Sequence, residues 1–230
     1  MISYAPGQRY AVLAKSGSGK TVFTVVLASS LVPPHPWQSD WQVWWLDTKH
    51  DPTDRRLLYD WGFRSATDKT RTARRIFSLS GGKDRVYEHA QLICQRALEV
   101  GGILLVFDEY GHVCKSRVDA GPFVEDVHKR GRGLDVGSIG GVQEPAYVPR
   151  YLFSQANHLA VGALTHLRDV KIARELNPLY APGWPERPDT VPDAHGFWWK
   201  YLDGHGRDGQ WVYWPHVGGW HGALRQPERV

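Results

Sequence analysis

Cysteine is scarce in this sequence, and so are the features that mark membrane or secreted proteins. The two cysteines, Cys94 and Cys114, have no C-x-x-C spacing and cannot build a disulfide framework, so we expect reduced thiols. No apolar run approaches the roughly 18 residues that a membrane-spanning helix needs. The N-terminus, residues 1–4, lacks the charged and apolar regions of a signal peptide. We therefore expect a cytoplasmic protein without a membrane segment of its own.

The excess of basic over acidic residues is also small. Net charge is +4 and the pI is about 9.1, which permits a polyanionic partner without requiring one. The eleven histidines contain no H-x-x-x-H pair and no mixed Cys/His set with zinc spacing, so a structural zinc site is not expected. Tryptophan, by contrast, is abundant, with 11 residues, and large aromatic side chains most often pack in cores and interfaces.

Apolar runs alternate with amphipathic segments along most of the chain. This alternation predicts an α/β fold with a mostly parallel central sheet, and the length suits one sizeable domain. The expected strands are 9–14, 41–46, 75–79, 103–107, 136–142 and 159–164. The expected helices are 20–31, 57–61, 84–100, 123–127, 151–156 and 170–176.

The composition changes near residue 177, where prolines become frequent. Two short aromatic runs, 197–202 and 210–214, flank a glycine-rich turn and predict a β-hairpin. We therefore expect a main domain over 1–180 and a small Pro- and Trp-rich, β-rich C-terminal extension over 181–230, packed on the core.

A Gly/Ser-rich loop joins the first expected strand to the first helix. Its sequence, A-K-S-G-S-G-K-T, is a Walker A motif with Ala14 in place of the usual first glycine. In such a loop the backbone N–H groups converge on the phosphates of ATP, and the helix adds its positive N-terminal end. Lys20 is expected to reach the β- and γ-phosphates, and the Thr21 hydroxyl to bind Mg²⁺. The expected nucleotide-binding residues are Lys15, Ser16, Gly17, Ser18, Gly19, Lys20 and Thr21.

The strand expected over 103–107 ends in two acids, which predicts a Walker B motif. A buried strand would deliver Asp108 to the Mg²⁺ shell. The adjacent Glu109 would then act as the base that activates the attacking water. Two acids at this position favour ATP hydrolysis over phosphoryl transfer to a small acceptor.

Further candidates flank the strand expected over 136–142. Gln143 ends that strand and would face the γ-phosphate, although an ordinary loop amide is an alternative interpretation. Arg130 and Arg132 precede the strand, where either could reach the nucleotide of a neighbouring subunit and stabilise transition-state charge. The alternative for both arginines is a favourable cation at a helix C-terminus.

The order of these motifs resembles that of the HerA–FtsK superfamily of P-loop ATPases. Its viral genome-packaging members are the most similar in size. The resemblance covers about residues 8–176 and leaves the tail unmatched. It rests on the Walker A and B motifs, L-D-T-K at 46–49, G-R at 131–132, Q-E-P at 143–145 and S-Q-A-N at 154–157.

The resemblance implies a RecA-like core, ATP and Mg²⁺ as cofactors, and a homo-oligomeric ring of five or six subunits. It also implies movement of double-stranded DNA, most plausibly during viral genome packaging, with a capsid or portal protein as a further partner. The location would then be the host cytoplasm or a capsid vertex. Residues 133–135 and the following strand also resemble Zot-type phage morphogenesis ATPases, so an assembly ATPase that does not translocate DNA stays an alternative. A small-molecule kinase is disfavoured by the acid pair and Gln143.

Two basic segments are weaker candidates for DNA contacts. One comprises Lys69, Arg71, Arg74 and Arg75, and the other comprises Lys115 and Arg117. Phosphate contacts are one interpretation. A solvated surface is the favoured one.

Overall fold

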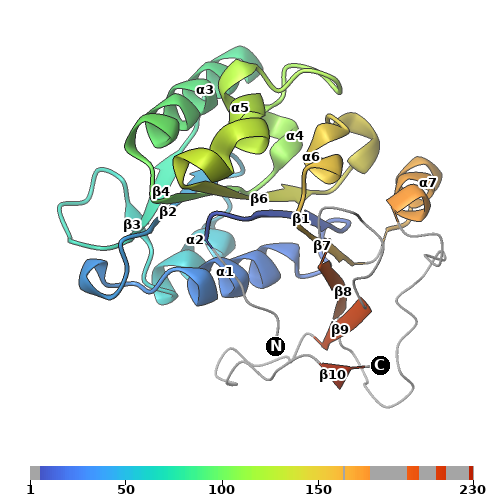
Figure 1. Ribbon diagram of the computed structural model, residues 1–230, viewed down its shortest axis with the longest axis horizontal. Helices are drawn as coiled ribbons and strands as arrows, with labels where there is room; N and C mark the ends of the chain where they lie inside the picture. Colours follow the sequence, from blue (N-terminus) through green and yellow to red (C-terminus); the bar gives the residue numbers. More distant parts are fainter. Residues whose placement is uncertain (1–5, 163, 177–195, 202–210, 216–227, 230) are drawn as a thin grey trace.

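The computed structural model describes residues 6–162, 164–176, 196–201, 211–215 and 228–229, the last three segments by their backbone. Its centre is a sheet of seven parallel strands in the order β7-β1-β6-β5-β2-β4-β3 (Figure 1). Their bounds are β1 Arg9–Leu13, β2 Gln42–Asp47, β3 Arg64–Ser65, β4 Arg74–Ser78, β5 Ile103–Phe107, β6 Val136–Val142 and β7 His158–Val161.

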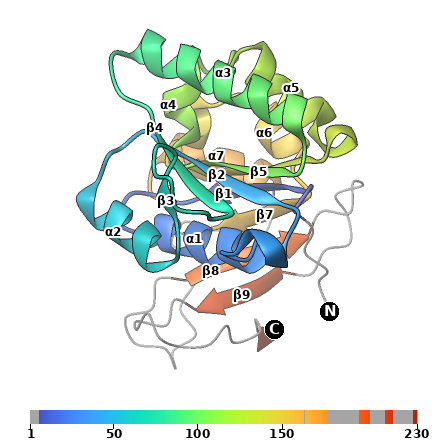
Figure 2. The ribbon, with the colours of Figure 1, turned by 90° about the vertical axis from the view of Figure 1, so that its left-hand side faces the viewer.

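Helices cover both faces of the sheet, giving three layers (Figures 1 and 2). One face carries α1 (Lys20–Leu31) and α2 (Pro52–Asp60). The other carries α3 (Lys83–Val100), α4 (Tyr110–Val113), α5 (Pro122–Arg130) and α6 (Tyr151–Ser154), and α7 (Leu167–Leu176) follows β7. Three 3₁₀ turns complete this part: η1 (Pro36–Gln38), η2 (Gly131–Leu134) and η3 (Pro145–Tyr147).

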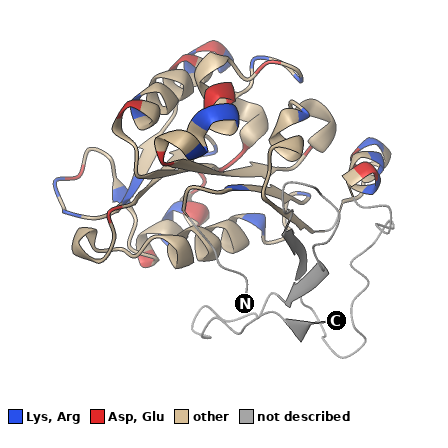
Figure 3. Ribbon diagram, viewed as in Figure 1, with Lys and Arg blue, Asp and Glu red and all other residues tan. Residues whose placement is uncertain are grey.

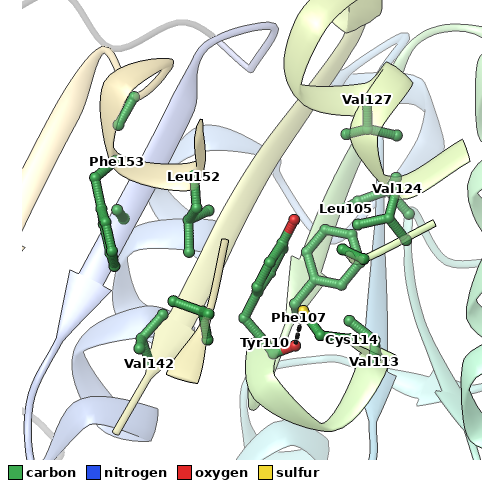
Figure 4. Packing of buried hydrophobic residues seen from close by; sticks show 14 of the residues in the cluster. Leu105, Phe107, Tyr110, Val113, Cys114, Val124, Val127, Val142, Leu152 and Phe153 are labelled. Carbon is green, nitrogen blue, oxygen red and sulfur yellow. Dashed lines mark hydrogen bonds between the residues drawn. The ribbon is translucent and has the colours of Figure 1, made fainter. Parts of the chain in front are cut away.

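The central strand β5 explains why the core has two halves. All five of its residues are fully buried, as its uninterrupted apolar sequence predicts for a strand covered on both faces. Side chains alternate between the faces, so Leu105 and Phe107 join the core under α3 and α5, while Leu104 and Val106 join the core over α1. Figure 4 shows Leu105 and Phe107 packed with Tyr110 and Val124.

The α/β prediction is confirmed, and every expected strand and helix has a counterpart. The differences are local. Helix α2 starts at Pro52 rather than at residue 57, because Asp51 accepts hydrogen bonds from the N–H groups of Thr53 and Asp54 and so caps an earlier turn. The short β3 and α4 had no periodic signal long enough to predict them.

The expected C-terminal hairpin is present and extends the sheet. Strands β8 (Gly196–Tyr201), β9 (Trp211–Pro215) and β10 (Glu228–Arg229) are antiparallel, and β8 pairs with β7 (Figure 2). The turn expected over 203–209 lies outside the described residues. The boundary near residue 180 stays a prediction.

Both cysteines are free and buried, in agreement with the expectation of reduced thiols. Burial raises the pKa of the Cys114 thiol to about 12, and its Sγ donates to the carbonyl of Tyr110 (Figure 4). Neither side chain is therefore a reactive thiol. Among the described residues, no helix is long and apolar enough to span a bilayer.

Candidate active site

The predicted site residues other than Arg130 and Arg132 lie at the carboxyl ends of neighbouring strands, together with Lys49. The phosphate-binding loop follows β1, Gln143 follows β6, the acid pair follows β5, and Lys49 lies two residues beyond β2. Because parallel strands share one direction, their carboxyl ends form one edge, where open α/β sheets bind ligands. One strand, β6, separates β1 from β5.

The phosphate-binding loop has the backbone that an anion site requires. Gly17 (φ 74°) and Gly19 (φ 82°) both lie in the left-handed region, which residues with a Cβ rarely adopt. Ser18 Oγ donates to the carbonyl of Lys15 at 2.7 Å and closes the loop. Helix α1 begins directly after Gly19, with no side-chain cap and no acid in its first turn. Its N-terminal N–H groups are thus directed to a ligand rather than to a side chain, and they fit a phosphate.

Lys20 lies inside the site and contacts the Walker B segment. Its Nζ is 3.2 Å from the carbonyl oxygen of Asp108 and 3.4 Å from Glu109 Oε2. Burial lowers the pKa of Lys20, and the Glu109 carboxylate opposes that shift. Strand β6 passes so close that a Cβ on Gly141 would be 2.7 Å from the Asp108 carbonyl and 3.3 Å from Lys20 Nζ. Only glycine fits there.

The two acids occupy different surroundings. Asp108 is buried and 3.4 Å from Lys49 Nζ; burial raises its pKa to about 6, although Lys49 and Lys20 act in the opposite direction. Glu109 is held from the end of the neighbouring strand β6, where the backbone N–H of Gln143 donates to Glu109 Oε1 at 3.1 Å. The sheet therefore fixes the carboxylate predicted to be the catalytic base.

Gln143 contributes its backbone to the site, in addition to the side-chain role that is predicted for it. Its N–H contacts Glu109 Oε1. The side chain is half-buried and lines a cavity of about 340 Å³ that Glu109 also lines. A role for the amide in detecting the γ-phosphate stays a prediction.

Thr21 and its partner Asp54 lie at the α1 side of the site. The Thr21 hydroxyl donates to Asp54 Oδ2 at 3.3 Å. Asp54 is half-buried, and burial raises its pKa while Lys49 lowers it. The donor set of a threonine hydroxyl and nearby carboxylates suits a hard cation such as Mg²⁺. In the described segments, no group of three or more His, Cys, Asp and Glu side chains could hold a metal ion on its own.

Sequence reasoning missed the roles of Asp54 and Lys49. Lys49 was noted only within the L-D-T-K motif, and Asp54 was not singled out. A signal for both was present, because the Asp51–Pro52 pair marks the start of a helix directly after β2. That places Asp54 in the first helical turn at the strand edge where the site lies.

Arg130 and Arg132 lie at the opposite edge of the sheet. Arg130 ends α5 and pairs with Asp126, and exposed Arg132 is in η2, just before β6. The seven residues of β6 separate Arg132 from Gln143, which is about 20 Å of extended chain. Neither arginine can reach the phosphate-binding loop of its own subunit, so a role in hydrolysis requires a neighbouring subunit.

The arginines nearest β4 in the first basic segment serve the fold, and buried Arg74 corrects the favoured interpretation of this segment as a solvated surface. The Arg74 guanidinium is buried and donates to the carbonyls of Val32, Trp61 and Ser29, all on neighbouring segments. Arg75 similarly donates to three carbonyls of the loop before β4, those of Ser65, Asp68 and Thr70. Lys69 and Arg71 are exposed, as are Lys115 and Arg117 of the second segment.

Comparison with known proteins identifies the fold but no sequence family. No protein-family model and no curated protein sequence matches the chain. Among solved structures, B204, the DNA-packaging ATPase of Sulfolobus turreted icosahedral virus, aligns with a TM-score of 0.60 at 15% identity, over 92% of this chain and 98% of its own. B204 of Sulfolobus turreted icosahedral virus 2, solved in complex with AMPPCP, aligns with a TM-score of 0.58 at 12% identity, over 92% and 98%.

A conjugation protein also has a similar structure. The pCW3 conjugation coupling protein TcpA, solved with ATPγS, aligns with a TM-score of 0.53 at 14% identity, over 90% of this chain and 60% of its own. At such low identity the similarity concerns the fold. This chain has the P-loop NTPase fold of the genome-packaging NTPase B204, which is the fold that the resemblance to the HerA–FtsK superfamily implies.

Proposed function

We propose that this protein hydrolyses ATP and uses the energy to move double-stranded DNA, in the setting of viral genome packaging. One observation carries the hydrolytic part. The phosphate-binding loop, with Lys20, stands against an acid pair whose Glu109 is fixed by the neighbouring strand β6. A site that only binds nucleotide has no need of a second, oriented carboxylate.

The residues divide the work of hydrolysis between them. The backbone of 15–19 and Lys20 would hold the phosphates, while Thr21 and Asp108 would hold Mg²⁺, which supplies charge neutralisation on the phosphate oxygens when bound. Glu109 would take a proton from water as the water oxygen bonds to the γ-phosphorus. The bond from that phosphorus to the bridging oxygen breaks, and ADP and phosphate leave.

We further propose that the protein works as a ring of five or six subunits. The exposed arginines at the amino edge of the sheet support this, because they cannot serve their own subunit. In a ring that sets this edge against the next subunit's nucleotide, Arg132 would stabilise the charge that develops on the γ-phosphate. Arg130 is second, since it already pairs with Asp126.

The DNA-moving part rests on the likeness of fold and on charge. The similar structures include those of a DNA-packaging ATPase and a conjugation coupling protein, both with TM-scores above 0.5. Net charge is +4, and Lys and Arg residues alternate with acidic residues along the helices and loops of the ribbon (Figure 3). We infer double-stranded DNA as the polyanion, and a capsid or portal protein as the partner that anchors the ring.

The test is whether DNA controls turnover. ATP hydrolysis is measured with and without linear double-stranded DNA, and movement is followed by displacement of a triplex strand from that DNA. We expect stimulation by DNA and displacement that requires ATP, with the Lys20→Ala variant inactive in both assays. If DNA does not alter hydrolysis and no triplex strand is displaced, the result favours the alternative, an assembly ATPase that does not translocate DNA.

A further inference from the structure

Lys49 lies among three acids, two that follow β5 and one from α2. Its Nζ is 3.4 Å from Asp108 Oδ1 and 3.9 Å from Glu109 Oε2, and Asp54 of α2 adds a third nearby negative charge. The side chain is 19% exposed. An ammonium group this deeply placed needs charged partners, and the acid pair provides them.

The loop that presents Lys49 is held in one conformation. The Asp47 carboxylate, which is buried, accepts a hydrogen bond from the His50 N–H at 2.8 Å and another from Arg55 Nε at 2.7 Å. His50 has a φ of 56°, a left-handed conformation that is unfavourable for a residue with a Cβ. Such a conformation persists only where its surroundings enforce it, and His50 directly follows Lys49 in this loop.

A second contact ties the same loop to the segment after Glu109. The Thr48 hydroxyl and His112 Nδ1 are 3.0 Å apart, and His112 belongs to α4, which begins one residue after Glu109. The end of β2 and the end of β5 are therefore joined through Thr48 as well as through Lys49.

Lys20 and Lys49 differ in what else they must do. Lys20 belongs to the phosphate-binding loop, so bound phosphate competes with Glu109 for its ammonium group. Lys49 lies two residues beyond β2, and its ion-pair partners are the carboxylates of Asp108 and Glu109. Once Lys20 contacts the phosphates, Lys49 still pairs with the carboxylates of Asp108 and Glu109.

We propose that Lys49 is a positioning residue for ATP hydrolysis, which holds the carboxylates of Asp108 and Glu109 in place while Lys20 contacts phosphate. This inference rests on the proposed ATPase activity. It predicts that loss of the Lys49 charge impairs the chemical step, because Glu109 loses its orientation, and leaves nucleotide binding by the loop at 15–21 largely intact.

The experiment compares Lys49→Met with Lys49→Arg. Lys171→Met is the matched control, since Lys171 is exposed on α7. For Lys49→Met we expect kcat to fall about a hundredfold or more, with the dissociation constant for a fluorescent ATP analogue within about threefold of the parent. Lys49→Arg should recover most of kcat, because a guanidinium can contact both carboxylates. A merely structural lysine would give unchanged kcat in the folded Met variant.

Each failure has a distinct signature. If the parent hydrolyses ATP and folded Lys49→Met does so equally well, the Lys49 proposal is wrong and the proposed function stands. If Lys49→Met does not fold, Lys49→Gln repeats the comparison. If the parent itself is inactive, the proposed function fails. Thermal unfolding of the Lys49→Met and Glu109→Gln single and double variants tests whether the two side chains contact each other. Non-additive changes in the free energy of unfolding support the contact, and additive changes contradict it.

Discussion

The two edges of the central sheet differ in how they use charge. At the carboxyl edge, Lys20, Lys49, Asp108 and Glu109 are buried or largely buried and contact one another. At the amino edge, Arg132 is exposed on a short turn. Buried charges must be satisfied within the subunit, whereas exposed ones are available to another molecule. One edge thus brings together, within a single chain, the acids and lysines that the proposed hydrolysis uses, and the other presents an exposed arginine that another molecule can contact.

The largest expected effect is at Glu109. Glu109→Gln keeps the shape and the hydrogen bond from Gln143 but removes the base, so kcat should fall about a thousandfold while ATP still binds. Steady-state turnover and binding of a fluorescent ATP analogue measure the two quantities. Glu99→Gln, an exposed acid near the end of α3, is the control. Normal turnover in Glu109→Gln would mean that another group activates the water.

Arg132→Ala tests the opposite edge. The variant should bind ATP normally and hydrolyse it about a hundredfold or more slowly, because a neighbour's transition-state charge is no longer stabilised. Arg130→Ala is the matched control. Mixing Arg132→Ala with inactive Lys20→Ala should restore part of the activity, since a mixed ring pairs an intact loop with an intact arginine.

The mixing experiment has clear opposing results. If mixed oligomers form but no ratio restores turnover, Arg132 does not act across an interface. If Arg130→Ala slows hydrolysis and Arg132→Ala does not, Arg130 is the arginine that acts on the neighbouring subunit's nucleotide. Its ion pair with Asp126 must then break.

A pair of glycine substitutions compares how tightly the two edges are packed. A Cβ at Gly141 would be 2.7 Å from the Asp108 carbonyl, whereas one at Gly133 would meet no atom within 4 Å. Gly141→Ala should lower the free energy of unfolding by about 1–3 kcal/mol and reduce kcat, because β6 must move away from the site. Gly133→Ala should change neither. Urea unfolding and turnover measure both, and equal effects would contradict the difference in packing.

The smallest expected effect concerns acid stability. Burial lowers the pKa of His128, which packs against Tyr110 and Phe107, to about 3. An unfolded histidine has a pKa near 6.5, so the unfolded chain takes up this proton first. Stability from His128 is complete above about pH 6.5 and declines as pH falls toward 3, by at most about 2 kcal/mol at pH 5.

His128→Phe should flatten this part of the stability profile. Urea midpoints between pH 5 and pH 7.5 are the measurement. The same replacement at exposed His166 is the control. An unchanged slope in His128→Phe would show that other groups cause the acid sensitivity.

Much of the fold could be predicted because its signals are local. The apolar run of β5 and the 3.6-residue period of α3 report burial directly, and both were located to within a residue. Helix α2 was placed too late because its first turn depends on the Asp51 cap rather than on apolar spacing. The strand β3 has two residues, too few for any period to show.

The sequence by itself determined the phosphate-binding loop, the acid pair and the alternation of strands and helices, since each depends on residues close together in the chain. The tertiary structure decided which charges meet. Lys49 is 59 residues from Asp108, and Thr21 is 33 residues from Asp54. Arg74 looked like a surface cation but lies buried among carbonyls. Such partners depend on the order of the strands in the sheet, and that order is set by packing between distant segments, which no local pattern records.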